Sequence, residues 1–153
     1  MRTATLIVAL AAAGLLAACG DDSSTPYLEF AGGGFIFNYR TADHYYGFVA
    51  RQKKTLPEGS RLEARFELPG GAEEVLEQIS RPGQLQYMFR SGDLEGIVKD
   101  HRYRAILRLI DGKTGAEIAR YERTFATEVD QSTLPKEPLV VGPGYQPNTA
   151  APQ

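Results

Sequence analysis

Residues 61–68 read Arg-Leu-Glu-Ala-Arg-Phe-Glu-Leu, and they show the clearest structural pattern in the sequence. Every even position carries an apolar side chain, and every odd position carries a charge whose sign alternates along the chain. A two-residue period with one apolar face is typical of a strand in an antiparallel sheet that has one buried face. We therefore expect residues 61–68 to form a half-buried β-strand.

The same alternation recurs on both sides of this stretch. It is seen in residues 35–40, 45–50, 85–89 and 103–109, and clusters of Gly, Pro, Asp and Ser separate these runs. Short alternating runs between turn clusters are typical of a β-sandwich. Residues 73–79 fit either a strand or a single helical turn.

A second pattern bears on the topology. Residues 97–103, Ile-Val-Lys-Asp-His-Arg-Tyr, place an apolar residue and a polar turn before a tyrosine that begins an alternating strand. This resembles the tyrosine corner of immunoglobulin-like and fibronectin type III domains, in which the phenol bonds to the backbone of the preceding turn. The resemblance implies an all-β, antiparallel immunoglobulin-like β-sandwich of about seven to nine strands, with Tyr103 buried.

The last predicted hairpin can be placed in register. Residues 103–109 and 119–125 both carry their apolar side chains at odd positions, and Asp111 to Gly115 reads as a five-residue loop. This loop would put Leu107 opposite Ala119. The outward Arg104 would then face Glu122 as a cross-strand ion pair.

The first 18 residues are predicted to be a targeting sequence. Arg2 precedes an apolar run from Leu6 to Ala18 that is too short to span a bilayer, as in a secretory signal peptide. Residues 16–19, Leu-Ala-Ala-Cys, resemble the lipobox of bacterial lipoproteins. This resemblance implies cleavage before Cys19 and a mature chain anchored by palmitate and related acyl chains on Cys19. An ordinary signal peptide cut near Ala18 and an uncleaved membrane anchor are the alternatives.

The residue after the cysteine bears on the destination. In the best-known sorting rule of the lipoprotein family, Asp in that place retains the protein at the inner membrane. Here Gly20 occupies it, and the acidic residues Asp21 and Asp22 follow. The resemblance thus favours the outer membrane, facing the periplasm, and leaves the inner membrane as the alternative.

Composition sets the domain plan. We expect a signal peptide at 1–18, a lipidated tether at 19–26, the sandwich at 27–130 and a Pro-rich extended tail at 131–153. Residues 139–141, Leu-Val-Val, could add an edge strand to the sandwich.

Charge and cysteine content exclude several classes of protein. The 153 residues hold 17 Lys and Arg against 19 Asp and Glu, so a basic nucleic-acid-binding surface is not expected. The single cysteine excludes an internal disulfide and a Cys-based metal site. No catalytic or cofactor-binding motif is present, and Gly32-Gly33-Gly34 reads as a bulge or turn before a strand.

The remaining polar candidates are few. Two Asp-His pairs, Asp43-His44 and Asp100-His101, precede aromatic strands and could converge on a metal, although adjacent side chains usually diverge. A mixed-charge face is expected where the outward Arg102, Arg104 and Arg108 lie near Glu117, Glu122 and Glu128. One tyrosine of the neighbouring pair Tyr45 and Tyr46 should be exposed. Four serines lie beside turn residues and are interpreted as structural: Ser60, Ser80, Ser91 and Ser132.

These residues predict a non-enzymatic module. We expect a lipid-anchored envelope lipoprotein that binds a protein partner or assists assembly, with no catalytic residues, metal or cofactor. The alternatives are a small metal- or ligand-binding periplasmic protein that uses the Asp43-His44 and Asp100-His101 turns, and a hydrolase.

Overall fold

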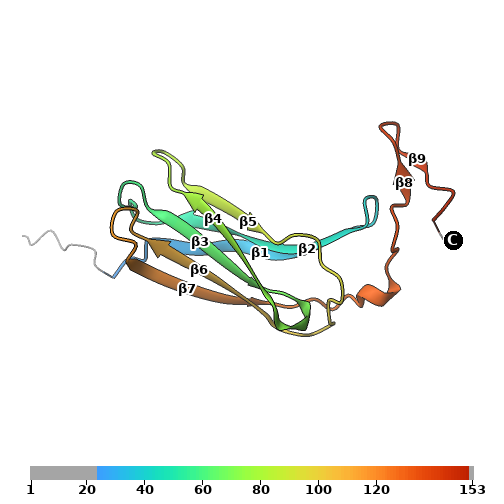
Figure 1. The fold of residues 1–153 in the computed structure, drawn as a ribbon, viewed down its shortest axis with the longest axis horizontal. Coiled ribbons are helices and arrows are strands. Elements are labelled where there is room, and N and C mark those ends of the chain that lie inside the picture. The colour runs from blue at the N-terminus through green and yellow to red at the C-terminus, as the bar shows by residue number, and fades with distance from the viewer. Residues whose placement is uncertain (1–23, 152–153) are drawn as a thin grey trace, which may run out of the picture.

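Two antiparallel sheets face each other in the computed structural model, which describes residues 24–151. The first sheet has the order β1-β2-β5, and the second has the order β4-β3-β6-β7 (Figure 1). The strands of the first are β1 (Leu28–Asn38), β2 (Asp43–Gln52) and β5 (Gln86–Arg90). Those of the second are β3 (Arg61–Glu67), β4 (Glu73–Ile79), β6 (Tyr103–Ile110) and β7 (Glu117–Phe125). The predicted all-β sandwich is confirmed.

The strand order is immunoglobulin-like. Strands one, two and five share one sheet and strands three, six and seven share the other, as in constant-type immunoglobulin domains. The fourth strand differs, because β4 pairs with β3 and not with β5. Tyr103 begins the sixth strand, and its hydroxyl accepts a hydrogen bond from the Val98 N–H at 2.8 Å. The predicted tyrosine corner is therefore present.

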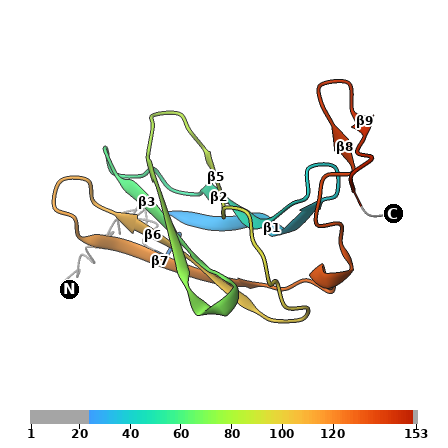
Figure 2. The ribbon, with the colours of Figure 1, turned by 45° about the vertical axis from the view of Figure 1, so that its right-hand side comes forward.

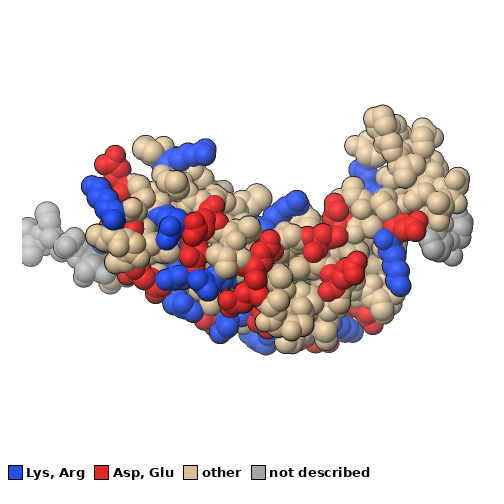
Figure 3. All heavy atoms as spheres, viewed as in Figure 1, with Lys and Arg blue, Asp and Glu red and all other residues tan. Residues whose placement is uncertain are grey.

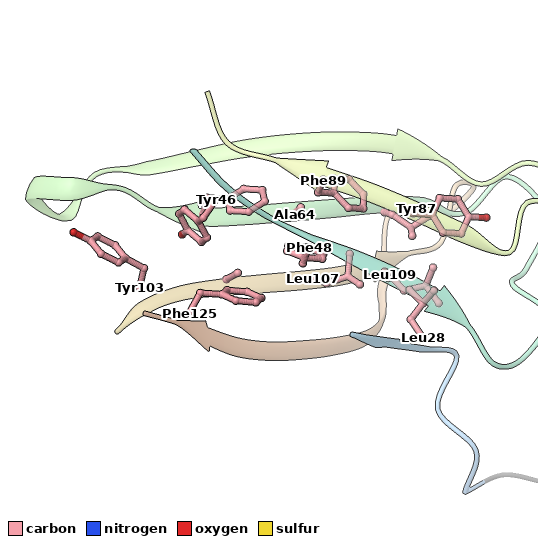
Figure 4. Packing of buried hydrophobic residues seen from close by; sticks show 14 of the residues in the cluster. Leu28, Tyr46, Phe48, Ala64, Tyr87, Phe89, Tyr103, Leu107, Leu109 and Phe125 are labelled. Carbon is pink, nitrogen blue, oxygen red and sulfur yellow. The ribbon is translucent and has the colours of Figure 1, made fainter. Parts of the chain in front are cut away.

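Aromatic side chains fill the space between the sheets (Figure 4). Tyr46 of β2 stacks on Phe35 at a centroid distance of 4.9 Å and meets Phe66 of β3 edge-on at 5.0 Å. Phe48 contacts Phe89 and Phe125, so the core joins both sheets. Edge-to-face and offset contacts of this kind add to the stabilisation from burial.

The alternation in β3 has the predicted faces, with one refinement. Leu62, Ala64 and Phe66 are fully buried in the core. Glu63 lies on the outer face and is nevertheless buried, because the guanidinium groups of Arg65 and Arg108 cover it at 2.6 and 2.7 Å. The outer face of this sheet therefore carries a network of closely packed ion pairs.

Residues 73–79, which fitted strand or helix, form β4. The helical turn lies just before it, at η1 (Pro69–Gly71). Two inward polar side chains of β4 link the edges of the two sheets: Glu74 accepts from the Gly92 N–H at 2.9 Å, and Gln78 donates to the Met88 carbonyl at 2.6 Å. Because these side chains bond the backbone of the β5 region, the inward face of β4 is partly polar.

The predicted register of β6 and β7 was wrong by two residues. Leu107 lies opposite Tyr121, and Arg104 lies opposite Thr124. The even slip keeps the apolar side chains on the inner face, whereas a bulge between Leu109 and Ile110 shifts the pairing beside the loop. Arg104 consequently does not pair with Glu122.

The C-terminal segment forms its own hairpin. A short helical turn, η2 (Gln131–Thr133), follows the sandwich, and β8 (Val140–Val141) pairs with β9 (Gln146–Pro147). The expected edge strand at 139–141 therefore pairs within the tail and adds nothing to the sandwich sheets. The described chain begins at one end of the sandwich, and this hairpin lies at the other (Figures 1 and 2).

Candidate ligand-binding pocket

A pocket of about 450 Å³ lies at the end of the sandwich beside the β1–β2 hairpin. Three segments meet around it. The residues around the start of β2 contribute Ala42 and His44. The stretch that follows β5 contributes Asp93, Glu95, Gly96 and Ile97. The segment after β7 contributes Asp130, Gln131, Ser132, Leu134, Pro135 and Lys136. Segments far apart in sequence thus form one concave surface, which is the usual setting of a binding site.

Gln131 holds these segments together. Its Oε1 accepts a hydrogen bond from the Ile97 N–H at 2.7 Å, and its Nε2 donates to the Leu94 carbonyl at 2.7 Å. The same Nε2 lies 3.1 Å from Nδ1 of His44. One amide side chain therefore satisfies two backbone groups and one imidazole, and it closes the floor of the pocket.

The contact with Gln131 indicates which tautomer a neutral His44 adopts. The Ile97 N–H can only donate, so it requires the amide oxygen on its side and leaves the amide nitrogen facing His44. Nδ1 of a neutral His44 is then the acceptor, and the ring proton lies on Nε2. The side chain is only 7 % exposed, and Nε2 has no hydrogen-bond partner among the described residues.

The pocket is predominantly acidic. Asp93 accepts the His44 backbone N–H, which anchors the start of β2. Asp130 caps η2, and hydrogen bonds from the Ser132 hydroxyl and backbone N–H lower the pKa of this carboxyl. Glu95 is exposed at the rim, and Lys136 supplies one positive charge. This surface suits a partner that presents a cationic or amide group beside an apolar one.

The two Asp-His turns do not form a cluster. His101 lies 3.3 Å from the Glu67 carboxylate, while His44 lies against Gln131. Asp43 accepts from the Thr41 hydroxyl, and Asp100 donates its N–H to the Thr127 carbonyl. Within residues 24–151 no three His, Cys, Asp or Glu side chains are grouped so that they could hold a metal ion.

Glu67, at the end of β3, forms contacts with Arg104 and His101. The Arg104 N–H donates to its carboxylate at 2.9 Å, and this bond, helped by His101, lowers the pKa of Glu67 against the opposing effect of burial. Tyr46 donates to the Glu67 carbonyl at 2.7 Å, and burial raises the pKa of Tyr46. These contacts stabilise the end of β3 and the start of β6.

The serine candidates have structural contacts in the described chain. Ser60 donates to the Pro57 carbonyl, and Ser91 donates to the Gly92 carbonyl. Ser132 bonds the Asp130 cap, and Ser80 donates its N–H to the Ser60 carbonyl. None of these four hydroxyls has a described bond to a histidine, so no Ser-His pair is present in this part of the chain.

Gly32-Gly33-Gly34 lies inside β1, beside a bulge between Phe30 and Gly32. The predicted bulge is present, although the glycines are within the strand and do not precede it. A Cβ on Gly33 would lie 2.6 Å from the Gly47 carbonyl oxygen and 2.7 Å from the Phe125 ring. Gly33 is therefore required for the close approach of β1 to β7.

The three outward arginines belong to the mixed-charge face that was predicted. Arg108 contacts both Glu63 and Glu117, whereas Arg104 lies 3.9 Å from Glu73. Arg102 donates to the Thr124 hydroxyl at 3.0 Å. Acidic and basic side chains are interspersed over this side of the molecule (Figure 3), and no single-sign patch for an anion is formed there.

The tyrosine pair in β2 divides between the two faces, as expected. Tyr46 is in the core, and Tyr45 is half-buried on the outer face under the Arg90 guanidinium, 4.5 Å from its ring centroid. The expected exposed tyrosine is therefore not found, because the Arg90 guanidinium covers the outward Tyr45 ring.

Gln131 is the residue of this candidate pocket with the most hydrogen bonds to the surrounding segments, and the sequence does not reveal it. It stands at the start of the segment predicted as an extended tail, and a single glutamine there has no periodicity or motif. The Asp130–Ser132 cap is the one local signal that a turn begins here.

No protein-family model, curated protein or solved structure matches this chain. No helix among residues 24–151 is long and apolar enough to cross a bilayer.

Proposed function

We propose that this protein is a bacterial lipoprotein that acts as a non-enzymatic binding or assembly module of the cell envelope. Acyl chains on Cys19 anchor it to the membrane, and its sandwich presents the pocket at His44 and Gln131 to a protein partner. The observation that carries the binding role is geometric. The described chain starts at one end of the sandwich, and the β1–β2 hairpin lies at the other (Figures 1 and 2), where Ala42 and His44 line the pocket. A short tether would hold the first end near the membrane and leave the pocket facing away from it.

The lipid anchor is tested at one atom. Cys19→Ser removes the thiol that accepts the diacylglyceryl group and keeps the apolar run, so palmitate labelling and processing by the lipoprotein peptidase should both be lost. Continued labelling of Cys19→Ser would disprove the anchor.

The destination is tested at the next residue. The outer membrane, facing the periplasm, is proposed because Gly20 follows the cysteine. Gly20→Asp should move the protein from the outer-membrane to the inner-membrane fraction of a density gradient. If the wild-type protein is already in the inner-membrane fraction, the proposed destination is wrong.

The partner site is tested by photo-crosslinking in cells. A photo-reactive amino acid at Lys136, in the pocket, should give a discrete adduct with one protein. The same substitution at Lys113, an exposed lysine in the β6–β7 loop, is the matched control and should not give that adduct. Identical adducts from both positions would show that the pocket is not the contact surface.

A further inference from the structure

His44 is the one buried titratable residue among those that line the pocket. It is 7 % exposed, whereas Asp93, Glu95, Asp130 and Lys136 are all exposed. Histidine is also the side chain that ordinarily gains or loses a proton between about pH 5 and pH 8. A proton on His44 would therefore place a charge in the pocket wall under conditions in which most carboxylates keep theirs.

The hydrogen bonds of Gln131 fit only the neutral form of His44. The Gln131 oxygen accepts from the Ile97 N–H, and the Gln131 nitrogen donates to the Leu94 carbonyl. The same nitrogen lies 3.1 Å from Nδ1 of His44. Both ring nitrogens of an imidazolium carry protons, so a charged His44 would set one donor against another. A rotated Gln131 amide would satisfy that proton but would set its nitrogen against the Ile97 N–H. We call Gln131 and these three contacts the Gln131 clamp.

The surroundings of His44 offer the charged ring no hydrogen bond in its present place. Nε2 has no partner among the described residues, and the Phe37 ring lies 5.7 Å away between centroids. The Asp93 carboxylate already accepts the backbone N–H of His44. The charged groups of the surrounding segments are Asp43 of β2, Asp93 and Glu95 after β5, and Asp130 and Lys136 after β7. Four of these five are acidic, so they attract an imidazolium toward the exposed surface and away from the clamp.

We propose that protonation of His44 opens the Gln131 clamp and loosens the pocket wall that follows β7, so that the pocket holds its partner at neutral pH and releases it in acid. This regulation rests on the proposed function, because it acts on the site assigned to the partner. Gln131 begins η2, and Leu134 and Pro135 of the pocket wall follow directly. When the clamp opens, this wall loses its bonds to the stretch after β5. A buried neutral histidine that joins two segments is a known basis for such switches.

Hydrogen exchange of the full chain, purified from cells and followed by mass spectrometry, measures the clamp at the Ile97 N–H. Rates at about pH 7.5 and about pH 5.5 are corrected for the intrinsic effect of pH on exchange. The protection of the peptide that contains Ile97 should fall roughly tenfold in acid, because the amide loses its acceptor. The chain has two histidines, and His101→Gln is the matched control. It removes the half-exposed ring beside Glu67 and should leave the fall unchanged.

Two variants remove the response to acid in different ways. His44→Phe keeps an aromatic ring beside Phe37 and takes up no proton, so protection at Ile97 should be equal at the two pH values. Gln131→Glu still offers an oxygen to the Ile97 N–H, and its carboxylate can pair with a protonated His44. The fall in acid should then be smaller than in the wild type, or reversed. An undiminished fall in either variant, or no fall in the wild type, would overturn the switch.

The photo-crosslink at Lys136 separates the switch from the proposed function. In cells held at the two pH values, the wild-type adduct should be lost in acid, and the His44→Phe adduct should persist. If the wild-type adduct forms equally at both values, the release of the partner by acid is wrong and the partner site stands. If no adduct forms at either value, the partner site is wrong, and exchange at Ile97 alone decides whether the clamp responds to pH.

Discussion

The hydroxyl of Tyr103 accepts a hydrogen bond from a backbone N–H five residues earlier in the chain. The ring is buried, and it packs edge-on against Phe35 and His101. One side chain thus joins the loop before β6 to the aromatic core. The Val98 side chain is exposed, so water can reach part of this turn if the bond is lost.

Tyr103→Phe tests the bond alone, because the ring remains in place. We expect a loss of about 0.5–1.5 kcal/mol in the free energy of unfolding, near the lower limit if water replaces the hydroxyl. Tyr103→Ala also opens a cavity and should cost about 3–5 kcal/mol. Urea titration measures both, and Tyr145→Phe, at an exposed ring in the tail, is the control. Equal stability of Tyr103→Phe and wild type would show that the bond does not stabilise the corner.

At the scale of elements, β1 can approach β7 because Gly33 lacks a side chain. Gly33→Ala would place a methyl group against the Gly47 carbonyl and the Phe125 ring, and a backbone atom cannot rotate away. We expect a loss of about 1–3 kcal/mol in the free energy of unfolding. Gly34→Ala is the matched control, because no atom lies within 4 Å of the added Cβ. Thermal unfolding of the two variants compares them, and equal midpoints would contradict the tight contact.

The ion-pair network on the outer face of β3 and β6 makes the free energy of unfolding depend on pH. Burial opposes ionisation of Glu63, but hydrogen bonds from Arg65 and Arg108 outweigh it and lower the pKa of this carboxyl from its ordinary value of 4.5. A lowered folded-state pKa means that the stabilisation is complete above about pH 4.5 and is lost as the pH falls through the folded-state value.

Glu63→Gln should therefore cost about 1.5–3 kcal/mol at pH 7, since it removes the charged hydrogen bonds of a buried carboxylate. The further loss of stability between pH 7 and pH 3 should be smaller than in wild type, because Glu63 no longer takes up a proton. Urea titrations at the two pH values measure this. Glu58→Gln, in an exposed loop, should keep the acid dependence of wild type. An undiminished acid loss in Glu63→Gln would mean that other carboxylates account for it.

The strands can be predicted from the sequence where apolar and charged residues alternate, because this alternation indicates which side chains are buried. Leu62, Ala64 and Phe66 could be assigned to the core because their neighbours are charged. The β6–β7 register could not be obtained in this way, because a two-residue slip keeps every side chain on its face. The burial of Ile106 on the outer face could not be predicted either. Ile106 lies opposite Arg65 of β3 and Glu122 of β7, whose long side chains can cover it, and the alternation within β6 gives no sign of this.

At the scale of the whole molecule, the pocket depends on chain that lies beyond the last strand of the sandwich. Gln131 carries the bonds to Ile97, Leu94 and His44. A local pattern cannot reveal such a residue, because its partners are 34 to 87 positions away in the sequence. The folding unit should therefore include η2 as well as the seven strands.

Two shortened chains test this boundary. Residues 24–134 should fold with a cooperative melt that EDTA does not change, because the core is aromatic and aliphatic. Residues 24–130 should be less stable by about 1–3 kcal/mol, since the Ile97 N–H and the Leu94 carbonyl lose their partner. Gln131→Ala in the longer chain should reproduce most of that loss, whereas Gln86→Ala, at an exposed position of β5, should not. If residues 24–130 are as stable as 24–134, Gln131 does not stabilise the pocket floor, and a midpoint that falls on chelation would instead require a metal in the fold.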